Sequence, residues 1–235
     1  MPKQTEQKPA AAAKYEWRKT EKAFYLPKEK GPHRIDVPEM KFFAVEGAGS
    51  PADEEFQARV GLLYALSYAV RMMPKSGWTP PGYQEYTVFP LEGVWTMDTD
   101  AWRGGALDKT KLRYKLMIRQ PRFVTPDVAA RAMESARKKV PADLLDRASF
   151  ESFSDGPSVQ MVHVGAYDTE PETFAAMDDY MKERGLVRTE RAHREIYLSD
   201  PRKVSPEKNR TLLRFFHLNA APGAKRTPDA GKAAK

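Results

Sequence analysis

Two stretches of the sequence show the same succession of features, and this internal duplication limits the fold more than any other property of the chain. The first begins with the apolar run KFFAVEGAG and continues with SPADEEFQARVGLLYALSYAVRMM. The second begins with VQMVHVGAY and continues with DTEPETFAAMDDYMKERG. An offset of 118 residues places Gly47 on Gly165 and Phe56 on Phe174 without a gap. The match predicts two copies of one structural unit.

Each copy is expected to run strand, helix, strand, strand. The last two strands are EYTVFPLEGVW and LRYKLMIRQP in the first copy, and REIYLSD and RTLLRFFHL in the second. The first helix carries apolar residues at helical spacing, with Ser50 as the expected N-cap and Pro51 in the first turn. In the second copy, Thr169 and Glu172 have the spacing of a capping box, and Gly185 suits the helix end.

The expected fold is α+β, with duplicated strand-helix-strand-strand (SHS2-type) units forming a pseudo-twofold antiparallel sheet. We place the first repeat at about 41–120, a linking helix at about 125–139 and the second repeat at about 158–218. Two half-sheets with helices on one face predict a central ligand cleft between them.

Charge is concentrated at the two chain ends. The formal net charge is +7, of which residues 1–14 carry +2 and residues 219–235 carry +3. Both ends are rich in Ala, Pro, Gly and Lys, so we expect disordered basic tails around a nearly neutral domain at 15–218. Nucleic-acid binding through these tails remains a minor alternative, and the connector PKEKGPHRIDVPE is too broken by proline for a helix-turn-helix.

Several classes of chemistry are not supported by the composition. The chain has no cysteine and no long apolar segment, so we expect a cytoplasmic protein without disulfides or membrane contact. Its four histidines are too scattered for a zinc helix, and GAGSP lacks the remaining glycine of a dinucleotide-binding loop. We predict no metal and no cofactor.

A glutamate in the strand-like segment HREIYLSD is the first candidate for chemistry. Side chains alternate along a strand, so His193, Glu195 and Tyr197 share one side and Ile196 and Leu198 the other. Taken alone, this pattern also fits a surface carboxylate on a solvated face.

A family resemblance favours the cleft. The segments DVPEMKFF, VEGAGSP, EYTVFPLEGVW, YKLMIRQPRFVT, VHVGAYDTEPETF and REIYLSDPRKVSPEK occur in this order and together resemble stand-alone GyrI-like small-molecule-binding proteins over roughly residues 15–217. The resemblance implies the duplicated fold found in effector domains of multidrug-sensing regulators, with a buried strand glutamate, here Glu195, facing the ligand. It also implies relatedness to proteins that hydrolyse the cyclopropane ring of bulky aromatic DNA-alkylating compounds, using an aromatic cage.

The expected site combines two kinds of residue. Glu195 orients a water as general base, and Tyr197 donates a hydrogen bond to Glu195 or to the ligand. Stacking or polar contacts with the ligand are expected from Trp95, Tyr68, Tyr86, Glu92, Tyr114 and His163. Core packing is the alternative role for the aromatic residues, and a turn carboxylate is the alternative for Glu92.

The leading hypothesis is a cofactor-independent hydrolase that detoxifies bulky, flat, partly hydrophobic molecules carrying a strained electrophilic ring. Its rival is a protein with the same site that only sequesters such molecules, or an effector-type module that acts on another protein. Both need the aromatic residues and the carboxylate, so the sequence does not separate them.

Overall fold

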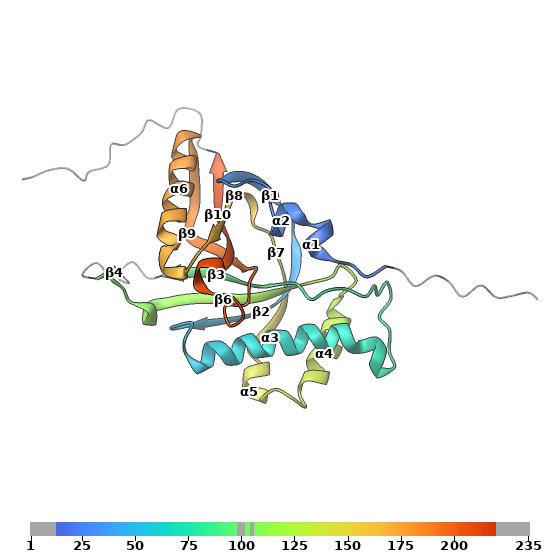
Figure 1. Cartoon of the computed structure of the whole chain (residues 1–235). Coiled ribbons are helices and arrows are strands. Elements are labelled where there is room, and N and C mark those ends of the chain that lie inside the picture. Colours follow the sequence, from blue (N-terminus) through green and yellow to red (C-terminus); the bar gives the residue numbers. More distant parts are fainter. Residues whose placement is uncertain (1–12, 98–101, 104–105, 220–235) are drawn as a thin grey trace, which may run out of the picture.

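One eight-stranded antiparallel sheet organises the computed structural model, which describes residues 13–97, 102–103 and 106–219. The strand order is β1-β8-β10-β9-β3-β6-β2-β7 (Figure 1). Its strands are β1 (His33–Val37), β2 (Met40–Ala48), β3 (Leu91–Met97), β6 (Leu112–Gln120), β7 (Ala148–Phe153), β8 (Gly156–Val164), β9 (Leu186–Tyr197) and β10 (Arg210–Asn219). A separate ribbon pairs β4 (Trp102–Arg103) with β5 (Ala106–Leu107).

The duplicated α+β architecture expected from the sequence is confirmed. The first unit is β2, α3 (Glu54–Met72), β3 and β6, and the second is β8, α6 (Glu170–Glu183), β9 and β10. The two units join where β3 pairs antiparallel with β9, from Glu92 opposite Ile196 to Trp95 opposite His193. Helix α4 (Pro126–Ala136) is the linking helix expected between the units; the Thr125 hydroxyl caps it, and it packs on α3.

Each half of the sheet has its own long helix. Helix α3 contacts β2 and β6, and α6 contacts β8 and β9, as Figure 1 shows. The α3 side buries Leu62, Leu63 and Leu66 completely or nearly so, whereas α6 buries Met177 and Met181. Each such side chain contributes roughly 1.5–3 kcal/mol through its removal from water. Shorter helical segments are α5 (Ala142–Leu145) and the 3₁₀ turns η1 (Met73–Ser76), η2 (Lys109–Lys111), η3 (Tyr167–Thr169) and η4 (Pro206–Lys208).

The opposite face of the sheet buries charges under the N-terminal segment. Helices α1 (Trp17–Thr20) and α2 (Lys22–Tyr25) lie over this face, where the backbone carbonyls of Ala23 and Phe24 accept hydrogen bonds from Gln160 and Arg214. The indole of Trp17 donates to the carbonyl of Val88 at 3.0 Å. The N-terminal segment therefore packs on the domain.

Some local expectations are wrong, each because of a contact that the sequence did not reveal. Helix α3 begins at Glu54 with Asp53 as N-cap, and the Asp53 carboxylate accepts from the backbone N–H of Ser50. The capping box at Thr169 does not form, since its hydroxyl donates to the carbonyl of Ala166. Strand β1 lies within the segment expected to be a connector. The tail residues 1–12 and 220–235 lie outside the described residues.

Candidate functional site

Strand β9 presents different chemistry on its two sides. His193, Glu195 and Tyr197 lie on the face that carries α3 and α6, while Arg194 and Ile196 lie on the opposite face. Glu195 stands directly across from Gly93 of β3, at the junction of the two units. The carboxylate therefore lies where the two units meet, on the face that carries α3 and α6.

Two neighbours on its own strand hold the Glu195 carboxylate. The Tyr197 hydroxyl donates to Oε2 at 2.9 Å, and Nε2 of His193 lies 3.0 Å from Oε1. The indole N–H of Trp95 donates in turn to the Tyr197 oxygen at 2.8 Å. The side chain of Glu195 is 12% exposed. A chain of donors, indole to phenol to carboxylate, thus fixes the orientation of an acid that keeps limited access to solvent.

Tyr197 remains protonated in this arrangement. Burial raises its pKa well above the usual value, and the negative charge of Glu195 raises it further. The phenol therefore acts as a hydrogen-bond donor to Glu195 throughout the neutral pH range.

Three aromatic side chains pack beside this chain of donors. Trp95 stacks on Phe56 with ring centroids 5.9 Å apart, and Tyr114 meets the Phe56 ring edge-on at 5.0 Å. Tyr114 also lies 5.2 Å from Trp95. All three are nearly inaccessible to solvent. Their faces are covered by one another and not by solvent, so in this structure the three rings form part of the core beneath α3.

Two glycines make room for these rings. A Cβ atom at Gly93 would lie 2.7 Å from Nε1 of Trp95, and a Cβ atom at Gly47 would lie 2.4 Å from the Tyr114 ring. Real Cβ atoms do not approach other atoms this closely, so each glycine allows its aromatic neighbour to lie flat on the sheet. Sequence reasoning used Gly47 only to align the repeats and missed this role.

Three partly exposed tyrosines lie on α3 and on η3. Tyr68, predicted as a ligand contact, is 44% exposed on α3 and neighbours Tyr64, which is 36% exposed. Tyr167, on η3, is 42% exposed and meets Tyr197 edge-on with centroids 6.4 Å apart. Tyr64 and Tyr68 thus neighbour each other on α3, and Tyr167 lies beside Tyr197, the hydrogen-bond partner of Glu195.

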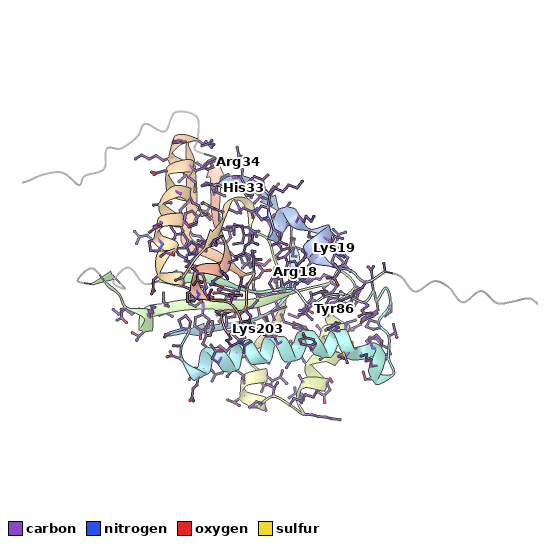
Figure 2. All side chains as sticks on the ribbon, viewed as in Figure 1. Arg18, Lys19, His33, Arg34, Tyr86 and Lys203 are labelled. Carbon is purple, nitrogen blue, oxygen red and sulfur yellow. The ribbon has the colours of Figure 1, made fainter. Side chains whose placement is uncertain are left out.

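The structure places three of the predicted contacts elsewhere. Tyr86 is buried in the α3 core, where it donates to the carbonyl of Ser67 at 3.3 Å, above the second half of α3 (Figure 2). Glu92 lies on the opposite face of the sheet and pairs with Arg194 at 2.9 Å. His163 is buried beneath the start of α6, with Nδ1 2.9 Å from the Thr173 hydroxyl. Strand β3 has no bulge, so its side chains alternate regularly between the two faces of the sheet. Gly93 belongs to the face of Glu195, and its neighbour Glu92 therefore points to the opposite face.

A second carboxyl group near Glu195 was missed. Glu170, the first residue of α6, is 7% exposed, and its Oε1 has no hydrogen-bond partner within the described chain. Burial raises its pKa to about 9, with a further contribution from the charge of Glu195. Its position at a helix start resembles an ordinary N-terminal acid in sequence, so no local signal reveals its burial.

The described residues contain no cluster of histidine and acidic side chains suited to a metal ion. None of the helices in these same parts of the chain is long and apolar enough to cross a bilayer. A small cavity of about 10 Å³ lies on the charged face, lined by Tyr25, Glu92 and Arg194 among others, and has roughly the room of a single water.

The duplicated fold, the central carboxylate and the aromatic residues define a small-molecule-binding domain. The chain belongs to the GyrI-like family of small-molecule-binding domains, whose model matches residues 32–215. This match confirms the resemblance noted in the sequence. No curated protein matches the chain.

Solved structures from Listeria innocua are similar along their whole length. One, described as a hydrolase, is 39% identical, with a TM-score of 0.78, and the match covers 87% of this chain and 100% of that one. A second hydrolase from the same organism is 40% identical with a TM-score of 0.79, covering 88% and 100%. An uncharacterized conserved protein is 40% identical with a TM-score of 0.80, covering 87% and 100%.

Proposed function

We propose that this protein binds bulky, flat, partly hydrophobic molecules beside Glu195 and hydrolyses those that carry a strained, electrophilic cyclopropane ring. The observation that carries the proposal is the chain of donors from Trp95 through Tyr197 to Glu195. It supplies an oriented carboxylate next to an aromatic surface, and the two Listeria proteins described as hydrolases support turnover.

In this proposal the ligand enters past the exposed Tyr64, Tyr68 and Tyr167, and it reaches the buried rings of Trp95 and Tyr114 through a rearrangement of those side chains. Glu195 accepts a proton from water as the water attacks the ring carbon. Tyr197 and His193 keep the carboxylate oriented toward that water. A ring conjugated to a carbonyl is already activated, so positioning and proton transfer supply the remaining catalysis.

Glu92, Tyr86 and His163 have no contact with the ligand in this proposal. Glu92 is separated from Glu195 by the sheet itself, and the other two are held in the core by hydrogen bonds. Their roles are structural, and conservative substitutions at these positions should change stability before they change ligand affinity.

Mass spectrometry of an aromatic cyclopropane-bearing alkylator, incubated with the protein, tests the proposal. The wild-type protein is expected to add one water to the compound, and Glu195→Gln to slow this by roughly 10²–10⁴-fold, the usual contribution of general acid–base catalysis. Glu190→Gln is the matched control, because Glu190 lies on the same strand but is exposed. Full turnover by Glu195→Gln would exclude Glu195 as the base.

Sequestration without chemistry is the second candidate function, favoured by the family, which is one of small-molecule-binding domains. It predicts that the unchanged compound co-purifies with the protein. In that case Glu195→Gln and Trp95→Phe should weaken retention, and no hydrated product should form at any enzyme concentration.

A further inference from the structure

Glu170 is a buried carboxyl group, and one of its oxygens has no hydrogen-bond partner among the residues that the structure describes. It lies in the first turn of α6, it is 7% exposed, and its Oε1 is fully shielded from solvent without a hydrogen bond in the described chain. Glutamate is rarely buried unless it is paired with a cation or with donors. Glu172, two residues further along the same turn, is exposed, as expected for an ordinary helix-start acid.

The groups around Glu170 favour its neutral form. Burial and the charge of Glu195 both raise its pKa, which reaches about 9. Tyr167, on the adjacent turn η3, is neutral, because burial raises its pKa as well. His163, on β8, is already bonded to Thr173 and to the carbonyl of Ala166.

Two positive groups could favour the ionised form of Glu170, but their effect on its pKa is smaller than that of burial. His193 lies against Oε1 of Glu195 and has no contact with Glu170 among its described hydrogen bonds. The helix N-terminus favours an anion by only about fivefold in the ionisation equilibrium when the group is exposed. The negative charge of Glu195 adds to the effect of burial, and together they keep Glu170 protonated near neutral pH.

We propose that Glu170 and Glu195 form a catalytic carboxyl pair, in which Glu195 is the base and Glu170 is the acid that protonates the ligand oxygen. The role rests on the proposed hydrolysis. Water oxygen bonds to the ring carbon and loses one proton to Glu195. The ring C–C bond breaks, its electron pair moves through the conjugated system to the carbonyl oxygen, and Glu170 gives that oxygen its proton. Transfer of one proton from Glu195 to Glu170 restores the starting state.

This pair explains two features of the site together. Oε2 of Glu195 accepts a hydrogen bond from Tyr197, and its Oε1 lies 3.0 Å from Nε2 of His193, so two neighbours orient this carboxylate. Glu170 has no donor and no cation among its described contacts, an environment suited to the protonated form. Neighbouring carboxyl groups in opposite environments are the usual arrangement for separate acid and base roles.

A titration of the ligand-free protein tests the pair without any turnover. Carbon-13 NMR of labelled glutamate carboxyls should show one buried group that stays protonated to about pH 9. That signal should disappear in Glu170→Gln, and its midpoint should fall in Glu195→Gln, because the neighbouring negative charge is gone. The pair is excluded if the Glu170 carboxyl titrates at an ordinary value, or if Glu195→Gln leaves its midpoint unchanged.

Kinetics test the acid role. With a cyclopropane substrate that the wild-type protein turns over, Glu170→Gln should lower kcat by roughly 10²-fold or more and leave KM within a few-fold. The wild-type kcat/KM, which reports groups of the ligand-free protein, should decline above about pH 9, and the variant should lack this decline. Glu172→Gln removes an exposed carboxylate from the same turn and should match the wild type. A Glu170→Gln variant with the same kcat as the wild type would exclude Glu170 as the acid.

The two experiments separate the two claims. If the wild-type protein hydrolyses nothing, the proposed function fails and the acid role fails with it, while the NMR titration still decides whether the carboxyl pair exists. If hydrolysis occurs and depends on Glu195 but not on Glu170, the proposed function survives and this inference alone is wrong.

Discussion

Replacing Asp155 with asparagine should strongly destabilise the protein. The Asp155 carboxylate accepts from Arg194, with Nη2 2.7 Å from Oδ1 and Nε 2.9 Å from Oδ2, and from Nη1 of Arg214 at 2.6 Å. The three side chains are at most 3% exposed. Removing one charge from a buried network leaves its partners uncompensated, at a cost of about 3–5 kcal/mol. Glu92 still neutralises part of the Arg194 charge, so we expect the lower end of this range.

Urea unfolding of the wild type, Asp155→Asn, Arg214→Gln and the double variant measures the effect. Because Asp155 and Arg214 are in direct contact, the double variant should be more stable than the sum of the single losses predicts, by about 1–3 kcal/mol. Asp36→Asn removes an exposed carboxylate and should change the free energy of unfolding by less than about 0.5 kcal/mol.

The difference in the free energy of unfolding between the wild type and Asp155→Asn should depend on pH with a definite sign. Burial alone would raise the pKa of Asp155, but Arg194 and Arg214 hold it below its usual value. The stabilisation is therefore present above the unfolded-state pKa, near 4, and is lost as pH falls through the lower folded-state value. A loss under about 1 kcal/mol at pH 7, or strictly additive single losses, would refute the reasoning.

Three further predictions concern single side chains. In Gly47→Ala the new Cβ would lie 2.4 Å from the Tyr114 ring and should displace it. Ligand binding should weaken by about tenfold in a tryptophan-fluorescence titration. Gly61→Ala is the control, because the space around Gly61 is open, and it should leave ligand binding unchanged. Tyr25→Phe removes hydroxyl contacts to Glu92 at 3.4 Å and Arg119 at 3.3 Å and should cost about 1 kcal/mol in urea unfolding. The free energy of unfolding of the wild type should fall relative to that of Glu170→Gln by about 1.4 kcal/mol per pH unit between pH 5 and 8. In this range the unfolded chain has lost the Glu170 proton and the folded protein keeps it. Equal pH dependence of the two free energies would contradict a buried, protonated Glu170.

The fold could be predicted from sequence because its signals are local and repeated. Strand alternation placed Glu195 and Tyr197 together, and the hydrogen bond between them confirms that they share a side. The two helices showed apolar stripes, and the common offset of Gly47 and Phe56 revealed the duplication before any contact was known.

The face of the sheet on which each remaining site residue lies depends on the register between strands, and a single sequence does not reveal that register. Trp95 and Glu92 are three residues apart and fall on opposite faces, so both could not reach one ligand. His163 lies on β8 and is separated from α6 in sequence by η3, but its ring lies under the helix and contacts the Thr173 hydroxyl. Glu170 became visible only through its burial, which depends on packing from η3 and β9.

The buried charges on the far side of the sheet also bear on the site, because Arg194 and Glu195 are adjacent in β9. A slip of one residue in this strand would turn the Arg194 guanidinium toward the aromatic rings and would place Glu195 beneath the N-terminal segment. The slip would leave Glu92 without the Arg194 cation and would leave Asp155 with Arg214 as its remaining cation. A hydrophobic network of equal volume could match the stability of the ion pairs. It would not penalise the slip as strongly, because this face would then hold no Glu92 or Asp155 carboxylate that loses its partner when Arg194 turns away. The charged network thus favours the single register in which Glu195 meets Tyr197, His193 and the aromatic residues.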